Sequence, residues 1–136
     1  MLVDGAGVPL AIVVTGANRH DVSQLEAVLD SIVIERPDIF ECPQHLCLDK
    51  GYTGEPALET VVLRGFIPHI RSRGEEKTEK VQHPDYKARR WVVEVSHSWI
   101  NRFRKLLVRF EKLTATYLGL LMFACAFIAC RKADII

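Results

Sequence analysis

The chain has 136 residues, of which 49% are hydrophobic and 26% are charged, and its formal net charge is +1. This composition is typical of a globular protein, and it excludes a disordered tail or a collagen-like chain. The length allows one domain of ordinary size. Because the first residues lack the pattern of a signal peptide, we expect the four cysteines to be reduced thiols in a cytosol rather than a disulfide framework.

The near-neutral total charge conceals two halves of opposite charge. Residues 1–65 carry 4 Lys and Arg against 10 Asp and Glu, a balance of −6, whereas residues 66–136 carry 14 against 7, a balance of +7. A basic half points to nucleic acid or another acidic surface, although basic surface helices also occur for solubility alone.

The first 70 residues predict strands that alternate with helices. A β-branched apolar run follows a glycine-rich turn at residues 4–7, which indicates a hairpin. Asp21 is the predicted N-cap of an amphipathic helix that Pro37 would end, and Pro56 suits the first turn of a second helix that Gly65 ends. The predicted order is β-β-α-β-α-β, an α/β pattern, at residues 2–4, 8–15, 22–35, 45–49, 55–64 and 66–70.

The remainder of the chain predicts a loop and then helices. Residues 71–85 are polar and charged, and residues 86–113 repeat apolar side chains at steps of three and four, which predicts one long amphipathic helix. Residues 117–130 are apolar nearly all round. This stretch of about 14 residues is shorter than the roughly 20 that a membrane span needs, so we expect a buried core helix and no membrane contact.

One carboxylate stands out in the predicted long helix. On a helix of 3.6 residues per turn, Glu94 lies within a stripe of polar and basic side chains that runs from Arg90 to Lys112 and includes Lys105 and Arg109. One interpretation is a solvated face in which Glu94 pairs with Arg90 or Arg102. The other is a helix that binds phosphates and carries one acid for metal chemistry.

Asp49 is the second candidate acid. It ends a predicted strand just before the turn Lys50-Gly51-Tyr52-Thr53-Gly54. Residues at the carboxyl ends of strands in open α/β sheets face the ligand crevice, and a carboxylate there can bind Mg²⁺. An Asp that bonds its own backbone to start a turn explains the same position equally well.

Cysteine and histidine positions predict no zinc site. Cys42, His45 and Cys47 offer soft ligands, but their spacing matches no zinc pattern and a fourth ligand is missing. Cys125 and Cys130 fall in the apolar stretch and are expected to be small core residues.

Three blocks of this sequence together resemble the DDE transposases of bacterial insertion sequences, in the superfamily of insertion sequences four and five. The blocks are LVDGAGVPLAIVVTGANRHD, CLDKGYTG and ARRWVVEVSHSWINRFRKL, and they cover nearly the whole chain in the family's order. The resemblance implies a ribonuclease-H-like fold, with residues about 1–70 as sheet and helices and about 86–133 as the helices that carry the Glu. It also implies that Asp49 is the second catalytic Asp and that Glu94, in the motif that begins at Arg90, is the catalytic Glu.

The chain departs from the family pattern at several positions. The first family Asp would lie on a central strand upstream of the first block, so the resemblance describes an amino-terminally truncated fold, β-β-α-β-α-β-α-α, without that strand. Asp4 does not replace it, because Asp4 falls in the hairpin turn. The usual Tyr before the Arg is Lys87, and the usual Arg after the Glu is Val95.

The resemblance also implies chemistry and partners. Family members cut transposon ends and join them to target DNA with two Mg²⁺ ions, for which Mn²⁺ can substitute, and here Asp49 and Glu94 would be ligands. Phosphate contacts would come from Arg90, Arg102, Lys105 and Arg109. We expect a bacterial protein that is cytoplasmic, associated with the nucleoid and inactive alone. The alternative is a remnant that binds DNA or pairs with a full-length transposase or a second copy.

Overall fold

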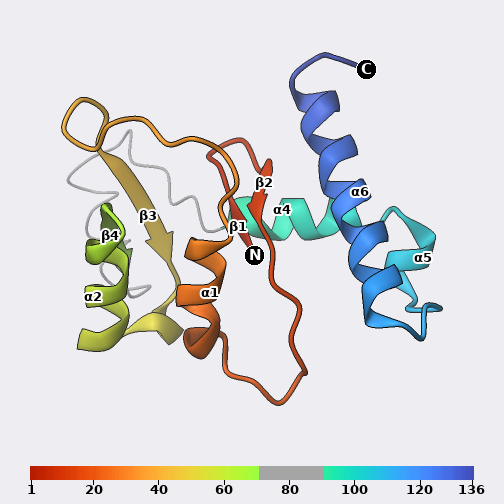
Figure 1. The fold of residues 1–136 in the computed structure, drawn as a ribbon, viewed down its shortest axis with the longest axis horizontal. Coiled ribbons are helices and arrows are strands. Elements are labelled where there is room, and N and C mark those ends of the chain that lie inside the picture. Colours follow the sequence, from red (N-terminus) through yellow and green to blue (C-terminus); the bar gives the residue numbers. More distant parts are fainter. Residues whose placement is uncertain (71–90) are drawn as a thin grey trace. The chain divides into compact units, whose positions relative to one another are not determined.

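The computed structural model describes residues 1–70 and 91–136, in which strands and helices alternate (Figure 1). The chain forms two compact units. The first combines Met1–Val14 with Trp91–Ile136, and the second comprises Thr15–Arg90. The amino-terminal hairpin therefore belongs with the carboxyl-terminal helices, whereas the sequence grouped it with residues 15–70.

The predicted hairpin opens the first unit. Strands β1 (Leu2–Val3) and β2 (Pro9–Ala11) pair antiparallel, which confirms the expected elements with shorter strands. In the turn, the Asp4 carboxylate accepts hydrogen bonds from the backbone N–H groups of Ala6 and Val8, both at 2.8 Å. Gly7 closes the turn with φ 86°, a left-handed conformation that favours glycine.

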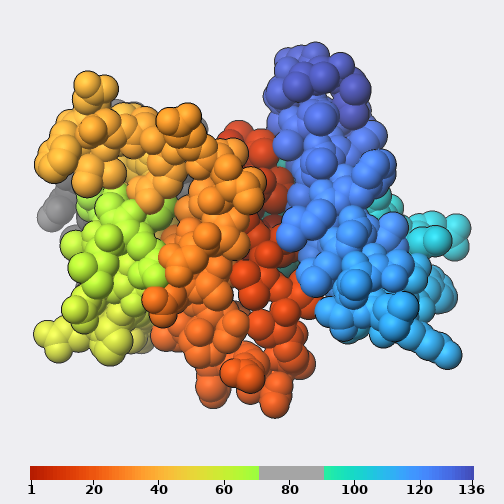
Figure 2. All heavy atoms as spheres, in the orientation of Figure 1, coloured from red at the N-terminus to blue at the C-terminus, as the bar shows by residue number. Residues whose placement is uncertain are grey.

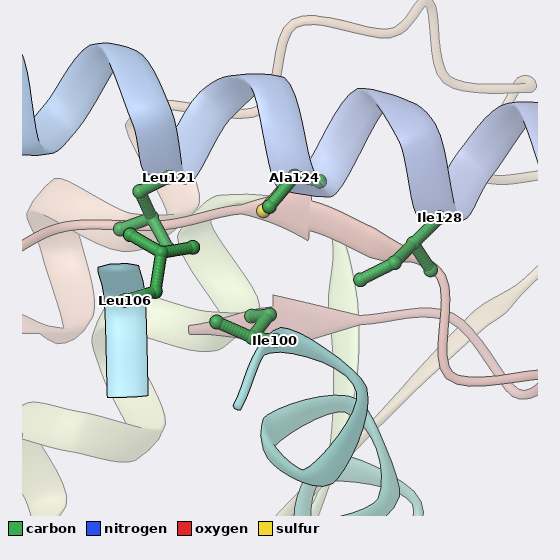
Figure 3. Close-up of a cluster of buried hydrophobic side chains, with 6 residues drawn as sticks. Ile100, Leu106, Leu121, Ala124 and Ile128 are labelled. Atoms are coloured by element: carbon green, nitrogen blue, oxygen red, sulfur yellow. The ribbon is translucent and has the colours of Figure 1, made fainter. Parts of the chain in front are cut away.

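The core of the first unit lies between three helices. Helix α6 (Thr114–Lys132) packs beside α4 (Trp91–Ile100) and α5 (Arg104–Leu107). Figure 3 shows side chains of α6 pointing toward Ile100 and Leu106. The buried cluster consists of Ile100, Leu106, Leu121, Ala124, Cys125 and Ile128. The core position expected for Cys125 is confirmed, and burial raises the pKa of its thiol. Cys130 is only half-buried.

The single long helix predicted over residues 86–113 is wrong within the described residues. Helix α4 ends at Ile100, the chain turns through residues 101–103, and α5 is a short separate helix. Tertiary packing explains the break, because the turn carries Phe103 against the core, where its ring meets Phe127 edge-on with centroids 5.9 Å apart. A helix that continued straight beyond Ile100 would not bring Phe103 to this contact with Phe127.

Helix α6 has 19 residues and is thus longer than its apolar stretch suggested. Its length and composition alone would allow it to cross a membrane. This is weak evidence for a membrane span, because core helices of soluble proteins pass the same test. It is not buried all round as expected. Leu121 and Ala124 face the core, whereas Met122 and Phe123 are 49% and 68% exposed. In the space-filling view the blue surface of α6 is open along much of its length (Figure 2).

A β-α-β arrangement forms the centre of the second unit. Strands β3 (Gln44–Leu48) and β4 (Phe66–Ile70) pair in parallel, from Gln44 opposite Phe66 to Leu48 opposite Ile70. Helix α2 (Glu55–Leu63) connects them, and Gly65 follows it with φ 73°. These elements confirm the sequence prediction to within one residue at each end.

The first helix of this unit is shorter than predicted. Residues Asp21–Gln24 form a 3₁₀ turn (η1), and α1 covers only Leu25–Asp30. His20 occupies the cap position without a side-chain bond, so Asp21 as N-cap is wrong. The hydroxyl of Ser31 donates to the Val28 carbonyl at 2.9 Å, and this competing bond helps to end the helix before the β-branched run at residues 32–34. Pro37 therefore does not end the helix.

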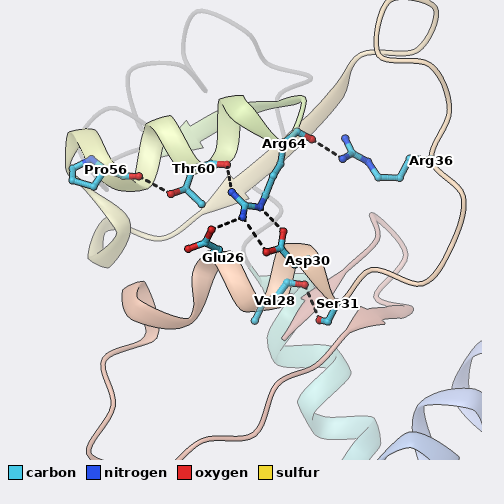
Figure 4. Close-up of polar contacts among 8 residues, drawn as sticks. All are labelled: Glu26, Val28, Asp30, Ser31, Arg36, Pro56, Thr60 and Arg64. Carbon is cyan, nitrogen blue, oxygen red and sulfur yellow. Dashed lines mark hydrogen bonds and ion pairs between the residues drawn. The ribbon is translucent and has the colours of Figure 1, made fainter.

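Arginines fasten the helices of the second unit to each other (Figure 4). The Arg64 guanidinium, at the end of α2, donates to Asp30 at 2.6 Å and to Glu26 at 2.7 Å, both on α1. Arg36 donates to the carbonyls of Arg64 and Gly65 and lies 3.8 Å above the Phe66 ring. These contacts hold α1 and the segment that follows it against α2 and β4.

The described residues form two separate two-stranded sheets, β1–β2 and β3–β4. The mixed α/β class is confirmed. A ribonuclease-H-like central sheet would need strand pairing that these segments do not make with each other, and its topology stays a prediction. The expected loop at residues 71–85 lies outside the described residues.

Candidate catalytic carboxylates

Asp49 lies directly after β3 and caps the 3₁₀ turn η2 (Lys50–Tyr52). Its Oδ1 accepts the backbone N–H of Gly51 at 2.6 Å, and the side chain is exposed. A Cβ at position 51 would lie 2.9 Å from this oxygen, so glycine permits the close approach. The turn interpretation of Asp49 is thus correct, and the same bond fixes the carboxylate at the carboxyl end of the strand, where the metal interpretation requires it.

The carboxylates of Asp21 and Asp49 both influence the phenol of Tyr52. Burial raises the pKa of the Tyr52 phenol, and the negative charges of Asp21 and Asp49 raise it further. Both carboxylates therefore act on the same side chain, where η1 packs against η2. The sequence had given Asp21 only a capping role, because no local spacing relates residues 21 and 49.

Glu94 lies in the first turn of α4 and is exposed. The opposite side of the helix is anchored by Ser96, which is fully buried. The Ser96 hydroxyl lies 2.6 Å from the Gly7 carbonyl and 3.1 Å from the Val92 carbonyl, to which it can donate. Because residues two apart point about 200° apart on a helix, this anchor turns Glu94 outward.

The basic side chains do not form the predicted stripe on one helix. Arg102 lies in the turn after α4, Lys105 on α5, and Arg109 beyond α5, all exposed. Arg109 donates to the Glu111 carbonyl at 3.3 Å and lies over the Tyr117 ring at 4.9 Å. Arg90 is outside the described residues. Within the described part of the chain, Glu94 forms no ion pair with Arg102.

The donor chemistry of these acids suits a hard cation, since carboxylate oxygens are the ligands that Mg²⁺ prefers. Asp49 and Glu94 belong to different units, so their convergence on one metal stays a prediction. In residues 1–70 and 91–136, no three His, Cys, Asp or Glu side chains are grouped closely enough to hold a metal ion. The residues present fit the metal in kind and would supply part of its ligands.

Comparisons with known proteins give a consistent result. Residues 46–131 match the sequence model of a family described as "Transposase DDE domain", a range that includes Asp49 and Glu94. The chain is 32% identical, over 98% of its length, to a Burkholderia cepacia protein whose name describes it as a transposase for insertion sequence element IS402. The chain spans 64% of the length of that relative. No solved structure matches significantly.

Proposed function

Because the chain belongs to the family of DDE transposases of insertion sequences, we propose that it supplies two of the three carboxylates that hold divalent metal ions in a DNA-cutting site. Asp49 would be the second acid and Glu94 the third. The observation that carries this proposal is the fixed, exposed Asp49 carboxylate at the end of β3, inside the matched range. The first acid would come from a strand outside residues 1–136.

The proposed reaction is phosphoryl transfer on DNA. Water breaks a phosphodiester bond at a transposon end, and the released 3′-hydroxyl then attacks a phosphodiester of target DNA. Mg²⁺ or Mn²⁺ would activate the attacking oxygen and stabilise the leaving one.

The protein's part in this reaction is positioning. The bond from Gly51 keeps Asp49 at the end of β3, and the Ser96 anchor keeps Glu94 on the outer side of α4. Arg102, Lys105 and Arg109, with Arg90, would bind backbone phosphates and so set the position of the DNA without choosing its sequence.

We propose a second function for the chain if residues 1–136 act without the first acid. Alone, the chain would bind DNA without cutting it. Alternatively, it would pair with a complete transposase or a second copy and inhibit transposition. Both functions place it with bacterial DNA in the cytoplasm.

The test adds an Asp-bearing strand upstream of residue 1. We expect the chain alone to give no Mg²⁺-dependent cleavage of transposon-end DNA, and a version extended at its amino terminus by the Asp-bearing strand of a relative to cleave. Asp49→Asn and Glu94→Gln should each lower cleavage by the extended protein by about 100-fold or more, because each removes a metal ligand.

The matched control is Glu59→Gln, an exposed acid on α2, which should leave cleavage unchanged. Full cleavage by either the Asp49 or the Glu94 variant would remove that residue from the site. Cleavage by the unextended chain would show that the upstream acid is dispensable.

A further inference from the structure

Two histidines on neighbouring strands share one face of the β3–β4 sheet. His69 on β4 pairs in register with Cys47 on β3, and His45 lies two residues before Cys47. Because alternate residues of a strand face the same side, these three side chains lie on one face. The burial pattern agrees, since His45 and Cys47 are exposed and Leu46 between them is buried.

The two imidazoles meet nitrogen to nitrogen. Nδ1 of His45 lies 2.7 Å from Nε2 of His69, and the ring centroids are 4.9 Å apart at an interplanar angle of 37°. A hydrogen bond of this length uses one proton between two nitrogen lone pairs. If that proton is lost, exposed His45 can turn its ring so that its Nδ1 and the His69 Nε2 point at one metal ion beside the line between them.

From this geometry we propose that His45 and His69 bind a late divalent transition metal, with Cu²⁺ as the best fit. Metal–nitrogen bonds of about 2.0 Å place adjacent ligands about 2.8 Å apart at the 90° angles of a square-planar site, but about 3.3 Å apart at tetrahedral angles. The hydrogen bond shows that the two nitrogens are close enough for one ion to reach both after the His45 ring turns, and nitrogen sites bind Cu²⁺ more tightly than the other divalent first-row metals. Square-planar nitrogen sites are typical of Cu²⁺ and Ni²⁺, whereas Zn²⁺ takes tetrahedral ones.

Among residues 1–70 and 91–136, no third His, Cys, Asp or Glu joins the pair, which leaves His45 and His69 as the proposed ligands there. Water would complete the coordination. The sequence alone indicated Cys42, His45 and Cys47 as soft ligands but not His69. His69 is 24 positions from His45 and comes beside it only because β3 and β4 pair in parallel.

This site is separate from the proposed Mg²⁺ site in both place and chemistry. His45 precedes Asp49 by four residues, which is about 13 Å along an extended strand. Imidazole nitrogen favours Cu²⁺, and carboxylate oxygen favours Mg²⁺. Occupation of the histidine pair would cross-link β3 to β4 without using either candidate catalytic acid.

The experiment measures Cu²⁺ binding by the full chain with Cys42→Ser and Cys47→Ser, since exposed thiols bind and reduce Cu²⁺. We expect a 1:1 complex in calorimetry and an electron paramagnetic resonance spectrum of a tetragonal site with two nitrogen ligands. In this background, His45→Ala should lower the affinity by about 100-fold, because the two linked ligands bind cooperatively.

The matched control is His20→Ala, an exposed histidine on a loop, which should leave affinity unchanged. Equal affinity in His45→Ala and its parent, or a spectrum with a single nitrogen ligand, would overturn the proposal. His69→Ala should reproduce the loss. If circular dichroism shows that the His69 variant is unfolded, the exposed His45 position decides the outcome alone.

Discussion

At the scale of single residues, the hydrogen bond from the Gly51 N–H fixes where the Asp49 carboxylate lies. Asp49 had two interpretations, a turn cap and a metal ligand; the bond to Gly51 confirms the turn cap, and the metal ligand stays a prediction. Asp21 was assigned wrongly, because capping depends on backbone angles that residue type alone does not fix. His69 had no local signal, since its partner lies on another strand.

The ion pair at the end of α2 yields a pH-dependent prediction. The hydrogen bond from Arg64 lowers the pKa of Asp30 below its ordinary value of 3.8, so the folded chain binds this proton more weakly than the unfolded chain does. The stabilisation is therefore present above about pH 4 and is lost as pH falls through the lowered pKa. Asp30→Asn should reduce the free energy of unfolding at pH 7, and variant and parent should converge as pH falls through the lowered pKa of Asp30.

Urea denaturation at a series of pH values measures this difference. Glu59→Gln serves as the control, because Glu59 is exposed on α2 and forms no ion pair within the described residues. A difference between Asp30→Asn and parent that stays constant from pH 7 to the acid range would contradict the prediction.

At the scale of elements, the prediction succeeded where local rules decide and failed where packing decides. Helix α2, with Pro56 in its first turn and Gly65 beyond its end, was predicted to within one residue. The helix expected over 86–113 was not, because the apolar period continues through a turn that the Phe103 contact with the core imposes. Periodicity reports which side chains are buried and does not report where the backbone bends.

The contact between α4 and the hairpin yields a second prediction. Ser96→Ala leaves the Gly7 carbonyl without its hydroxyl donor in a buried place, and it should lower the free energy of unfolding by about 1–3 kcal/mol. Ser98→Ala is the control, because Ser98 is exposed on the same helix and should change stability little. Thermal denaturation of both variants compares them. Equal melting temperatures would show that the bond to Gly7 contributes nothing.

At the scale of the whole molecule, the opposite charges of the two halves yield a prediction for DNA binding. We expect weak duplex binding without sequence preference, with an affinity that falls steeply as salt rises. Replacing exposed Arg102 and Lys105 by Ala should reduce the slope of log K against log salt by up to about two units, about one for each lost phosphate contact.

Fluorescence anisotropy over a range of salt concentrations measures this slope. The control is the double replacement of Arg19 and Lys50 by Ala, which removes the same charge from the acidic half and should leave the slope nearly unchanged. An unchanged slope in the Arg102 and Lys105 variant would exclude these residues as phosphate contacts.

The assembly of the first unit from both ends of the chain also sets an order of folding. Its hairpin ends at Val14 and its helices begin at Trp91, 77 positions later, whereas β3 meets β4 across only 22 positions, from Gln44 to Phe66. Closing the longer loop costs more entropy and slows folding. During synthesis the second unit can form its sheet first, because residues 1–14 must wait until residues 91–136 have been made.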